Sequence, residues 1–417
     1  MKKSILPVIV CFVVIVCQAQ VSIQSCQEKA RTNYPLIKQF DLISKSTEYT
    51  LSNASKAYLP QISLTGIGAY IFKGLPQFSI PGTTPEENSK FQMIGIGQIN
   101  QTVWDGGATH TQKEIITAGS EVEKASIDVA LHAVKERVNQ IYFGILLIDE
   151  QINQLHLGKE MLDRNVKAIT LSKNNGLVFQ TDVDELKAEV LSMNQKEIEF
   201  TFSRKGYVTM LSYLIGEQLP DDVHLEKPVA IESVVTLSNQ RPELQLYANQ
   251  RKLSLAQSSV QRVYNMPKIG LLGAGVLIEP GMSFGPSTLS SVALGGLSVS
   301  WNTAGLYKTS NNKQLNQIQL DKISSQEETF LFSTNLQLKQ SGSEIEKQKS
   351  ILTNDREIVT LKEKIRAAYQ LRYDNGSCSM NDLIQAIHKE SEARGQEALH
   401  QVQLLLNLYL YQTISGN

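Results

Sequence analysis

The sequence predicts a mainly helical protein with a smaller β part, built from one structural unit used twice. Three observations predict this class. Long runs rich in Glu, Lys, Gln, Leu and Ala carry apolar residues at steps of three and four and contain no proline. Four shorter segments alternate polar and apolar residues. The same landmarks recur in the same order about 200 residues apart.

Composition excludes several classes of protein. The chain has 417 residues, with 40 Lys and Arg against 41 Asp and Glu and a formal net charge of -1. It therefore lacks the basic surplus of a nucleic-acid-binding protein, and we expect no nucleic-acid partner. A hydrophobic content of 41% with 19% charged residues excludes a disordered chain. Four cysteines in this length exclude a disulfide scaffold.

Residues 1–19 have the pattern of a cleaved secretory signal peptide. Lys2 and Lys3 precede a short apolar run at 5–17, and Cys17-Gln18-Ala19 fits a cleavage site. The run is too short for a transmembrane helix. After cleavage only Cys26 and Cys378 remain, either as a disulfide or as two separate thiols. We therefore expect the protein to work outside the cytoplasm.

An internal repeat organises the rest of the chain. Two helical patterns begin at Pro35 and Pro242 and end 25 residues later at Pro60 and Pro267. Two further landmarks recur: Trp104-Asp105-Gly106-Gly107 with Trp301-Asn302-Thr303-Ala304-Gly305, and Asn175-Gly176 and Asp182 with Asn375-Gly376 and Asp382. This order predicts a first repeat at 20–216, a linker or equatorial segment at 217–239, and a second repeat at 240–417.

Each repeat is expected to contain the same elements. A helix comes first, at about 23–58 and 240–264, followed by a strand pair within 60–104 and 267–301. A hairpin of long helices ends each repeat, at 107–174 with 181–216 and at 306–374 with 381–412. A helix over 107–174 is about 100 Å long, which favours an extended coiled coil.

The extended segments at 61–72, 91–104, 268–277 and 291–301 predict strands. In 91–104, apolar residues such as Met93 and Ile99 occupy one face and polar residues the other, with Ile94 and Ile96 as exceptions; in the first segment Ile67 and Ile71 break the pattern. Lengths of 10–14 residues, with the aromatic residues Tyr70, Phe72, Trp104 and Trp301 near the ends, are typical of a transmembrane barrel. Half-buried strands of soluble proteins alternate as well.

Four strands cannot close a barrel. An open sheet edge in lipid leaves backbone groups unpaired, at several kcal/mol each. Two copies would give about eight strands and a filled interior, whereas three would give twelve strands and an open lumen. The sequence therefore predicts a homotrimer whose long helices continue the barrel as a tube.

The order of these landmarks resembles the TolC family of outer membrane efflux proteins over nearly the whole chain after residue 19. The most specific parts are Ala57-Tyr58-Leu59-Pro60-Gln61-Ile62-Ser63-Leu64, Val103-Trp104-Asp105-Gly106-Gly107, and Gly176-Leu177 followed by Thr181-Asp182-Val183. Asn302-Thr303-Ala304-Gly305 departs from the pattern. The resemblance implies a twelve-stranded outer membrane barrel, a long periplasmic α-helical barrel, and docking to an inner membrane transporter through a periplasmic adaptor.

The turns between the long helices are the candidate working sites. From the residues alone, Asn174, Asn175 and Gly176 allow a left-handed helix end, and Thr181 or Asp182 caps the next helix. The resemblance adds adaptor docking at the first turn and, by the repeat, at the second turn. The docking candidates are Gly176, Leu177, Thr181, Asp182, Gly376, Ser377 and Asn381.

Two further hypotheses concern the aperture of the helical tube. The family has two aspartates three positions apart there; this chain has Asp382 and Gln385. Asp382 forms either a ring of three carboxylates or only a helix-stabilising acid. Arg372, Tyr373 and Asp374 end the preceding helix and are candidates for bonds that hold a gate closed.

No pattern points to catalysis. The six histidines lack metal-ligand spacing, and there is no nucleophile elbow, Walker motif or Rossmann glycine pattern. We expect no enzyme, cofactor or metal. The leading hypothesis is an outer membrane exit duct of a tripartite efflux or type I secretion system. The alternative is a periplasmic coiled-coil protein that binds partners and has soluble hairpins instead of a barrel.

Overall fold

The structure is a computed structural model that describes residues 21–70, 72, 91–174, 179–229, 239–278 and 290–417. The predicted signal peptide, Gly176 and Leu177 of the first helical turn, and most of the two loops between paired strands lie outside the described residues.

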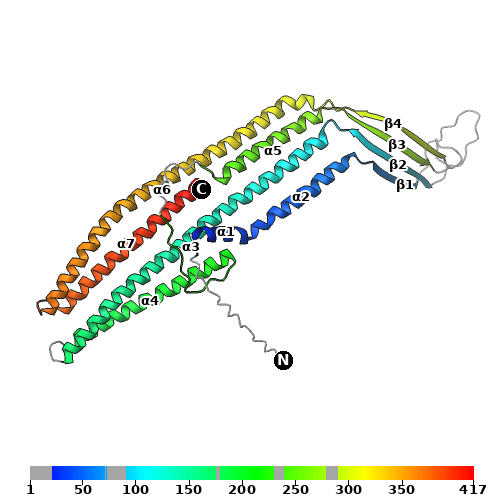
Figure 1. Cartoon of the computed structure of the whole chain (residues 1–417). Coiled ribbons are helices and arrows are strands. Elements are labelled where there is room, and N and C mark those ends of the chain that lie inside the picture. Colours follow the sequence, from blue (N-terminus) through cyan, green and yellow to red (C-terminus); the bar gives the residue numbers. More distant parts are fainter. Residues whose placement is uncertain (1–20, 71, 73–90, 175–178, 230–238, 279–289) are drawn as a thin grey trace, which may run out of the picture. The chain divides into compact units, whose positions relative to one another are not determined.

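The described residues confirm a mainly helical chain with four strands, and the elements follow the same order in both halves (Figure 1). The first half contains α1 (Ile23–Asn33), α2 (Lys38–Ser55), β1 (Gln61–Tyr70), β2 (Phe91–Trp104), α3 (Ala108–Asn174) and α4 (Gln180–Ile215). The second contains α5 (Pro242–Tyr264), β3 (Lys268–Ile278), β4 (Ser290–Ser300), α6 (Thr309–Asp374) and α7 (Met380–Ser415). Short 3₁₀ turns cover Pro35–Ile37, Lys56–Tyr58 and Leu306–Lys308.

The predicted first helix at 23–58 is wrong as a single element. It ends at Asn33, and Tyr34 is extended, with φ -64° and ψ 129°. A 3₁₀ turn then leads into α2. The ring of Pro35 disfavours helical geometry at the preceding residue, which explains the break.

Two compact units divide the chain, and each takes segments from both repeats. The first comprises Met1–Ile37, Ala130–Arg241 and Phe332–Asn417, and the second Lys38–Val129 and Pro242–Leu331. The repeat limits proposed from the sequence stay a prediction.

The main core of the first unit gathers around the middle of α3. Tyr142 and Phe143 are almost completely buried, and Ile23 and Cys26 of α1 join them. The hydroxyl of the buried Tyr142 lies 2.7 Å from the Val21 carbonyl oxygen and 2.6 Å from that of Glu226, so its single proton has an acceptor. Each large side chain buried in this way contributes about 1.5–3 kcal/mol. This core fixes α1 against the long helices.

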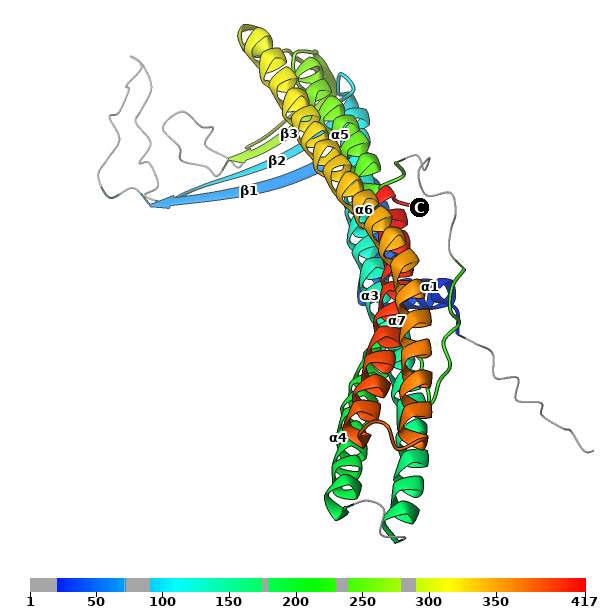
Figure 2. The same cartoon turned by 90° about the vertical axis from the view of Figure 1, so that its left-hand side faces the viewer.

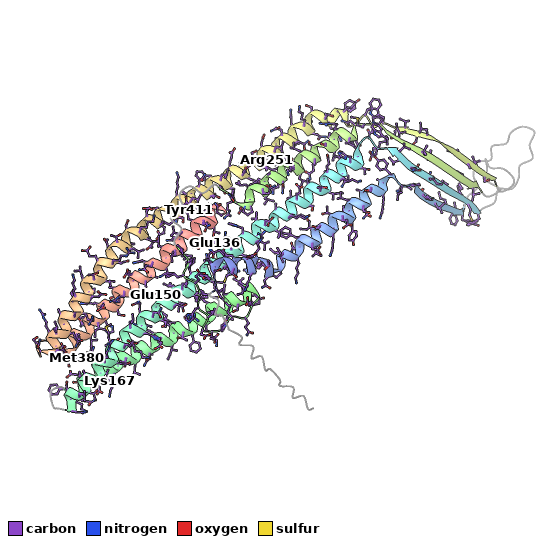
Figure 3. The ribbon with its side chains drawn as sticks, viewed as in Figure 1. Glu136, Glu150, Lys167, Arg251, Met380 and Tyr411 are labelled. Atoms are coloured by element: carbon purple, nitrogen blue, oxygen red, sulfur yellow. The ribbon has the colours of Figure 1, made fainter. Side chains whose placement is uncertain are left out.

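A second core of the first unit lies near the helical turns. It brings together Leu162 and Ile169 of α3, Leu186 and Met193 of α4, and Met380, Leu383, Ile384 and Ile387 of α7. Met380, labelled in Figure 3, is in the first turn of α7. The two helical hairpins therefore share one apolar core just behind their turns.

The second unit holds the sheet, which is antiparallel throughout with the order β1-β2-β3-β4 (Figures 1 and 2). The register pairs Gln61 with Asn100, Gln98 with Ala274, and Ala274 with Leu294. A bulge between Thr102 and Trp104 shifts the end of β2. Among the described residues, β1 and β4 each pair with a strand on one side only.

Helices α3, α5 and α6 are joined in the second unit by polar contacts. Asn249 of α5 donates to the Glu121 carbonyl oxygen at 3.1 Å. Arg251, labelled in Figure 3, forms an ion pair with Glu327 of α6. These contacts fix the helical segments that lead into and out of the sheet.

Cys26 and Cys378 are both free thiols in this structure. Of the two possibilities left open by the sequence, a disulfide or two separate thiols, the structure has the second. Cys26 lies in the main core of the first unit, and burial raises the pKa of its thiol to about 11. The protonated thiol there acts as a small apolar side chain.

Gly144 supplies a test of the packing between α3 and α4. A Cβ atom there would lie 2.9 Å from Cε1 of Tyr207, whereas a Cβ at Gly206 of α4 would meet nothing within 4 Å. We expect Gly144→Val to lower the free energy of unfolding by about 1–3 kcal/mol through overpacking. The matched change Gly206→Val should be neutral or slightly stabilising, because valine favours a helix more than glycine does.

Thermal unfolding followed by circular dichroism in detergent measures both variants. Equal midpoints for Gly144→Val and Gly206→Val would contradict a close approach of the two helices at Gly144.

Candidate functional site

The turn between α6 and α7 contains Gly376, the repeat counterpart of Gly176, and ends α6 in a left-handed conformation. Gly376 has φ +67°, which a glycine adopts without strain. The amide of Ser377 donates to the Arg372 carbonyl oxygen at 2.8 Å, and that of Gly376 to the Tyr373 carbonyl oxygen at 2.9 Å. These bonds satisfy carbonyl groups at the end of α6. Gly376 and Ser377 are thereby held exposed at the end of the hairpin.

A reciprocal cap begins α7. The Ser379 hydroxyl accepts from the Asp382 amide at 3.2 Å, and the Asp382 carboxylate accepts from the Ser379 amide at 3.0 Å. Hydrogen bonds from the Ser379 side chain and then from its backbone lower the pKa of Asp382. Asp382 therefore has a capping role in one chain, and its ring role stays a prediction. Asn381 and Gln385 are exposed on the same first turns.

The gating candidates contact their own helix in the described chain. The Arg372 guanidinium lies 5.7 Å from the centre of the Tyr369 ring. Asp374 accepts from the Gln370 side chain at 3.1 Å. Tyr373 packs on the core near the turns, and burial, followed by the nearby Asp182, raises its pKa. Bonds from these residues to a neighbouring copy stay a prediction.

At the other hairpin end, residues 175–178 between α3 and α4 lie outside the described residues. Asp182 accepts from the Phe179 amide at 3.0 Å, so it caps the helix from its third position. Thr181 is exposed, and its predicted role as a cap is not seen. Phe179, which the sequence reasoning missed, is 79% exposed. An aromatic residue at a position where a polar cap is usual was the available signal.

Charged contacts join the helices behind these turns. The buried Glu390 of α7 accepts from Arg366 of α6 at 2.5 Å and from Arg394 at 3.1 Å, and Arg394 also pairs with Glu363. His388 of α7 lies 3.1 Å from Glu189 of α4. A buried carboxylate needs such partners, so Arg366 and Arg394 fix the pairing of α6 with α7.

A buried carboxylate holds the corner between β2 and α3. Asp105 is 5% exposed, and its oxygens accept from the Thr109 amide at 2.6 Å, the Gly107 amide at 2.9 Å and the Tyr58 hydroxyl at 2.9 Å. Burial alone raises the pKa of this carboxyl, but the hydrogen bonds from Thr109, Tyr58 and Gly107 outweigh burial and bring the pKa to about 2. The carboxylate thus stays ionised and caps α3.

The second repeat repeats this corner with a neutral side chain. Asn302 accepts from the Ala304 amide at 3.0 Å and donates to the Tyr264 hydroxyl at 3.0 Å. A tyrosine and an Asp or Asn therefore meet at both corners. The sequence reasoning used the Trp and Gly landmarks but missed this pairing.

One face of the sheet is mostly apolar, with Gln101 and Ser291 as its polar members. Cross-strand partners share a face, and the register places Ile62 with Ile99, Leu64 with Gly97, and Leu271 with Leu297. Tyr70 pairs with Phe91 at one end, and Trp104 pairs with Ile269 at the other. An apolar band flanked by aromatic residues is the pattern that transmembrane barrels present to lipid.

On β1 and β2 the opposite face is polar toward the helices and aliphatic toward the loops, whereas β3 and β4 add Leu272 and Leu294 to its part near the helices. Next to the helices it carries the pairs Gln61–Asn100 and Ser63–Gln98. Closer to the loops the register brings together an aliphatic band, which consists of Ile67, Ile94, Ile96, Val276 and Val292. Ile67, Ile94 and Ile96 are the exceptions noted in the sequence, whereas Ile71 lies outside the described residues.

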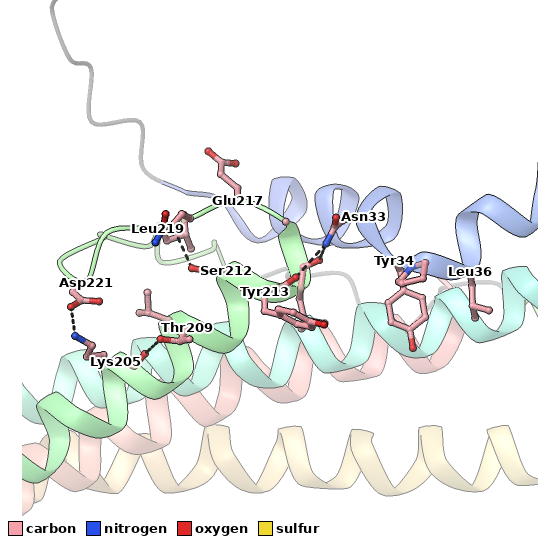
Figure 4. Close-up of a pocket in the computed structure, with 15 residues that line it drawn as sticks. Asn33, Tyr34, Leu36, Lys205, Thr209, Ser212, Tyr213, Glu217, Leu219 and Asp221 are labelled. Atoms are coloured by element: carbon pink, nitrogen blue, oxygen red, sulfur yellow. Dashed lines mark hydrogen bonds and ion pairs between the residues drawn. The ribbon is translucent and has the colours of Figure 1, made fainter.

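A groove of about 1160 Å³ lies in the first unit between the end of α4 and the segment at 33–36 (Figure 4). Val208, Leu214 and Leu219 supply apolar lining, and the Lys205–Asp221 ion pair is at its edge. The Asn33 side chain donates to the Leu214 carbonyl oxygen at 3.1 Å. This bond and the left-handed Gly216 close the end of α4, so the groove follows from how that helix stops.

Neither a metal centre nor a membrane helix is found where the structure describes the chain. No group of three or more His, Cys, Asp or Glu residues in the described ranges is placed to hold a metal ion. None of the described helices is both long and apolar enough to cross a bilayer.

Comparison with known proteins supports the fold. No protein-family profile and no curated sequence matches the chain. Among solved structures, the outer-membrane channel OprN matches with a TM-score of 0.68 at 14% identity, covering 95% of this chain and 90% of OprN. The chain has the fold of an outer-membrane channel. The outer membrane protein VceC of Vibrio cholerae matches with a TM-score of 0.65 at 13% identity, covering 94% of this chain and 96% of VceC.

A third match is the CmeC outer membrane channel of Campylobacter jejuni, with a TM-score of 0.63 at 15% identity over 94% of this chain and 85% of CmeC. The TolC-like fold predicted from the sequence is confirmed. Docking and aperture roles of the residues at the helical turns stay predictions.

The Asp105 corner predicts a specific sensitivity to acid. Because the pKa of this carboxyl is lowered from 3.8 to about 2, its contribution to stability is complete above pH 4 and is lost as the pH falls toward 2. We expect Asp105→Asn to remove about 2 kcal/mol of this pH-dependent stability and so to flatten the acid profile.

Thermal unfolding midpoints between pH 5 and pH 2 measure this effect. Asp41→Asn is the matched control, because Asp41 is exposed and pairs only across one helical turn with Lys45. Parallel profiles for the wild type and Asp105→Asn would show that the corner carboxylate does not matter for acid stability.

Proposed function

We propose that this chain is one protomer of a passive exit duct in the outer membrane. Three copies share a twelve-stranded β-barrel, and their long helices continue it as a tube through the periplasm. The duct docks to a periplasmic adaptor and an inner membrane transporter, and small molecules or polypeptides leave through it. It supplies a water-filled path and no catalysis.

The unpaired edges of the sheet are the observation that carries this proposal. β1 and β4 lie at opposite edges and, because every pair is antiparallel, run in opposite directions. The free edge of β4 in one copy therefore fits the free edge of β1 in the next as an antiparallel pair. Closure in this way leaves no edge in lipid. Three copies are preferred because eight strands leave an interior that side chains fill.

The two faces of the sheet give the barrel its orientation in the bilayer. The apolar face with aromatic residues at both ends faces lipid, and the face with Gln61, Ser63 and Gln98 lines the lumen. β2 has 14 residues. A strand of this length reaches about 45 Å at about 3.3 Å per residue, and tilted by about 40° it spans roughly the 30 Å of a hydrocarbon core.

The long helices offer surfaces for neighbouring copies. Ile358, Leu361 and Ile365 of α6 recur at steps of three and four, and they are 44%, 50% and 44% exposed. Ile198 and Phe202 of α4 form a similar pair. A helix with exposed apolar residues along one face in this way usually buries that face against another helix. A helical tube of several copies provides that partner.

The hairpin ends are the proposed docking sites for the adaptor. Gly376, Ser377 and Asn381 at the second turn are exposed, as are Thr181 and Phe179 at the first. Gly176 and Leu177 belong to the same proposal by the family resemblance. At the aperture, three copies of Asp382 bring three carboxylates together and attract cations, with Gln385 in place of a second acidic ring.

Efflux and type I secretion are both consistent with a passive duct, because the transporter selects the cargo. The alternative function is partner binding by a periplasmic coiled-coil protein that has no barrel. That protein would need no apolar sheet face bordered by aromatic residues, which is why the duct is preferred.

Two lysine variants test the duct. Leu64 is 85% exposed on the apolar face, and its neighbour Ser63 is on the polar face. We expect Leu64→Lys to block insertion of the detergent-purified trimer into planar bilayers, since a lysine in the hydrocarbon core costs about 2–4 kcal/mol per copy. Ser63→Lys should insert and lower cation conductance.

Chemical cross-linking in detergent should give a trimer for the wild type. A monomer that stays dispersed in plain buffer without detergent would contradict the duct and favour the coiled-coil protein. Insertion of Leu64→Lys with failure of Ser63→Lys would reverse the assignment of the faces.

The end of α6 supplies a test of gating. If Arg372 and Asp374 bond to a neighbouring copy at the aperture, replacing both by alanine removes those bonds and shifts the closed population toward open. We expect a higher single-channel conductance or open probability. Lys349→Ala, at an exposed position on the same helix, is the control. Unchanged conductance in the double variant would exclude Arg372 and Asp374 as the gate.

A further inference from the structure

The aliphatic band stands out because it lies on the face that the proposed function assigns to water. Ile67 pairs with Ile94, and one step closer to the helices Ile96 pairs with Val276, which pairs with Val292. The band therefore crosses the whole sheet from β1 to β4. The residues that broke the alternation in the sequence occupy adjacent rows of one surface.

The surface changes character within a short distance along the strands. On β1 and β2 the band gives way one row closer to the helices to Ser63 and Gln98, and then to Gln61 and Asn100. On β3 and β4 the same two rows still contain Leu294 and Leu272. On the opposite face at the level of the band lie Met93 and Leu277, so the strands are apolar on both faces here. Contact with lipid explains the apolar residues on one of these faces but not those on the face toward the lumen.

Closure of the sheet would turn the band into a ring. The band reaches both edge strands, through Ile67 on β1 and Val292 on β4, whereas Thr65 of β1 lies in the row of Ile96. Copies placed edge to edge would therefore form an aliphatic ring that Thr65 interrupts once per copy. Twelve strands spaced about 4.8 Å apart and tilted by about 40° enclose a barrel about 24 Å across between backbones. Such a barrel is wide enough to keep water, so the ring lines the path and does not block it.

We infer that this ring is a contact zone for the apolar part of the exported solute, so that an amphipathic solute is retained in the lumen more strongly than a wholly polar one. This rests on the proposed function. A solute with an alkyl or aromatic group removes apolar surface from water when it lies on the ring, while its polar part keeps partners in the rows with Ser63, Gln98 and Asn100. Contact on one wall of a wide lumen is weak, so the solute also leaves.

Current block in planar bilayers tests this inference. The probes are decyltrimethylammonium and tetramethylammonium, which share one charged head and differ in the alkyl chain. For the wild type we expect the half-block concentration of decyltrimethylammonium to be lower than that of tetramethylammonium by a factor on the order of ten or more. In Ile94→Thr/Ile96→Thr/Val276→Thr the two half-block concentrations should approach each other to within about threefold.

Two controls keep the test specific. Ile94→Val/Ile96→Val keeps the apolar surface and should retain the wild-type difference. Ser298→Thr, on the same face but nearer the helices, should also retain it. Threonine is β-branched like valine and suits a strand, and Ile96→Thr alone is the fallback if the triple variant does not insert.

The outcomes separate the two proposals. Absence of any trimeric conductance would overturn the duct itself. Conductance with equal block by both probes, or a difference that survives the threonine variants, would overturn the contact zone and leave the duct standing.

Discussion

A backbone amide or carbonyl group in the bilayer core must form its hydrogen bond with another protein group, because no water is present there to serve as a partner. The four-stranded sheet meets this requirement at its three internal pairings and leaves it open at the edges of β1 and β4. The proposed trimer follows from that deficit. The exposed apolar residues of α6 and α4 need partners too, and the other copies of the proposed trimer would supply them.

The sheet also requires well-fixed corners, since a strand in a barrel leads directly into a helix outside it. Asp105 and Asn302 hold these corners by accepting backbone amides and bonding a tyrosine from the preceding helix. At the far ends of the helices, Ser379 and Asp382 cap α7 in the same manner. Short polar side chains therefore hold the two strand-to-helix corners and the start of α7.

Local chemistry explains how much of this was predictable. Gly376 was predicted as the repeat counterpart of Gly176, where a left-handed helix end was expected because few other residues adopt that geometry. The alternating strands were placed within a residue or two. The break at Tyr34 was missed because proline also occurs in the first turn of helices, which allowed one continuous pattern. The grouping of Ile67, Ile94, Ile96, Val276 and Val292 depends on the register between strands. Single-strand alternation contains no information about register, so these residues were seen only as exceptions. Pairs such as Glu390 with Arg366 depend on tertiary packing in the same way.

The duplicated chain has not kept its two corners identical. One copy of the unit closes its strand-to-helix joint with an ionised group, and the other does so with an amide that carries no charge at any pH. In a ring of three chains, charged and neutral joints would then alternate around the circumference. Strong acid would weaken every second joint and spare the others, so the pseudo-sixfold ring would distort with threefold symmetry before it came apart.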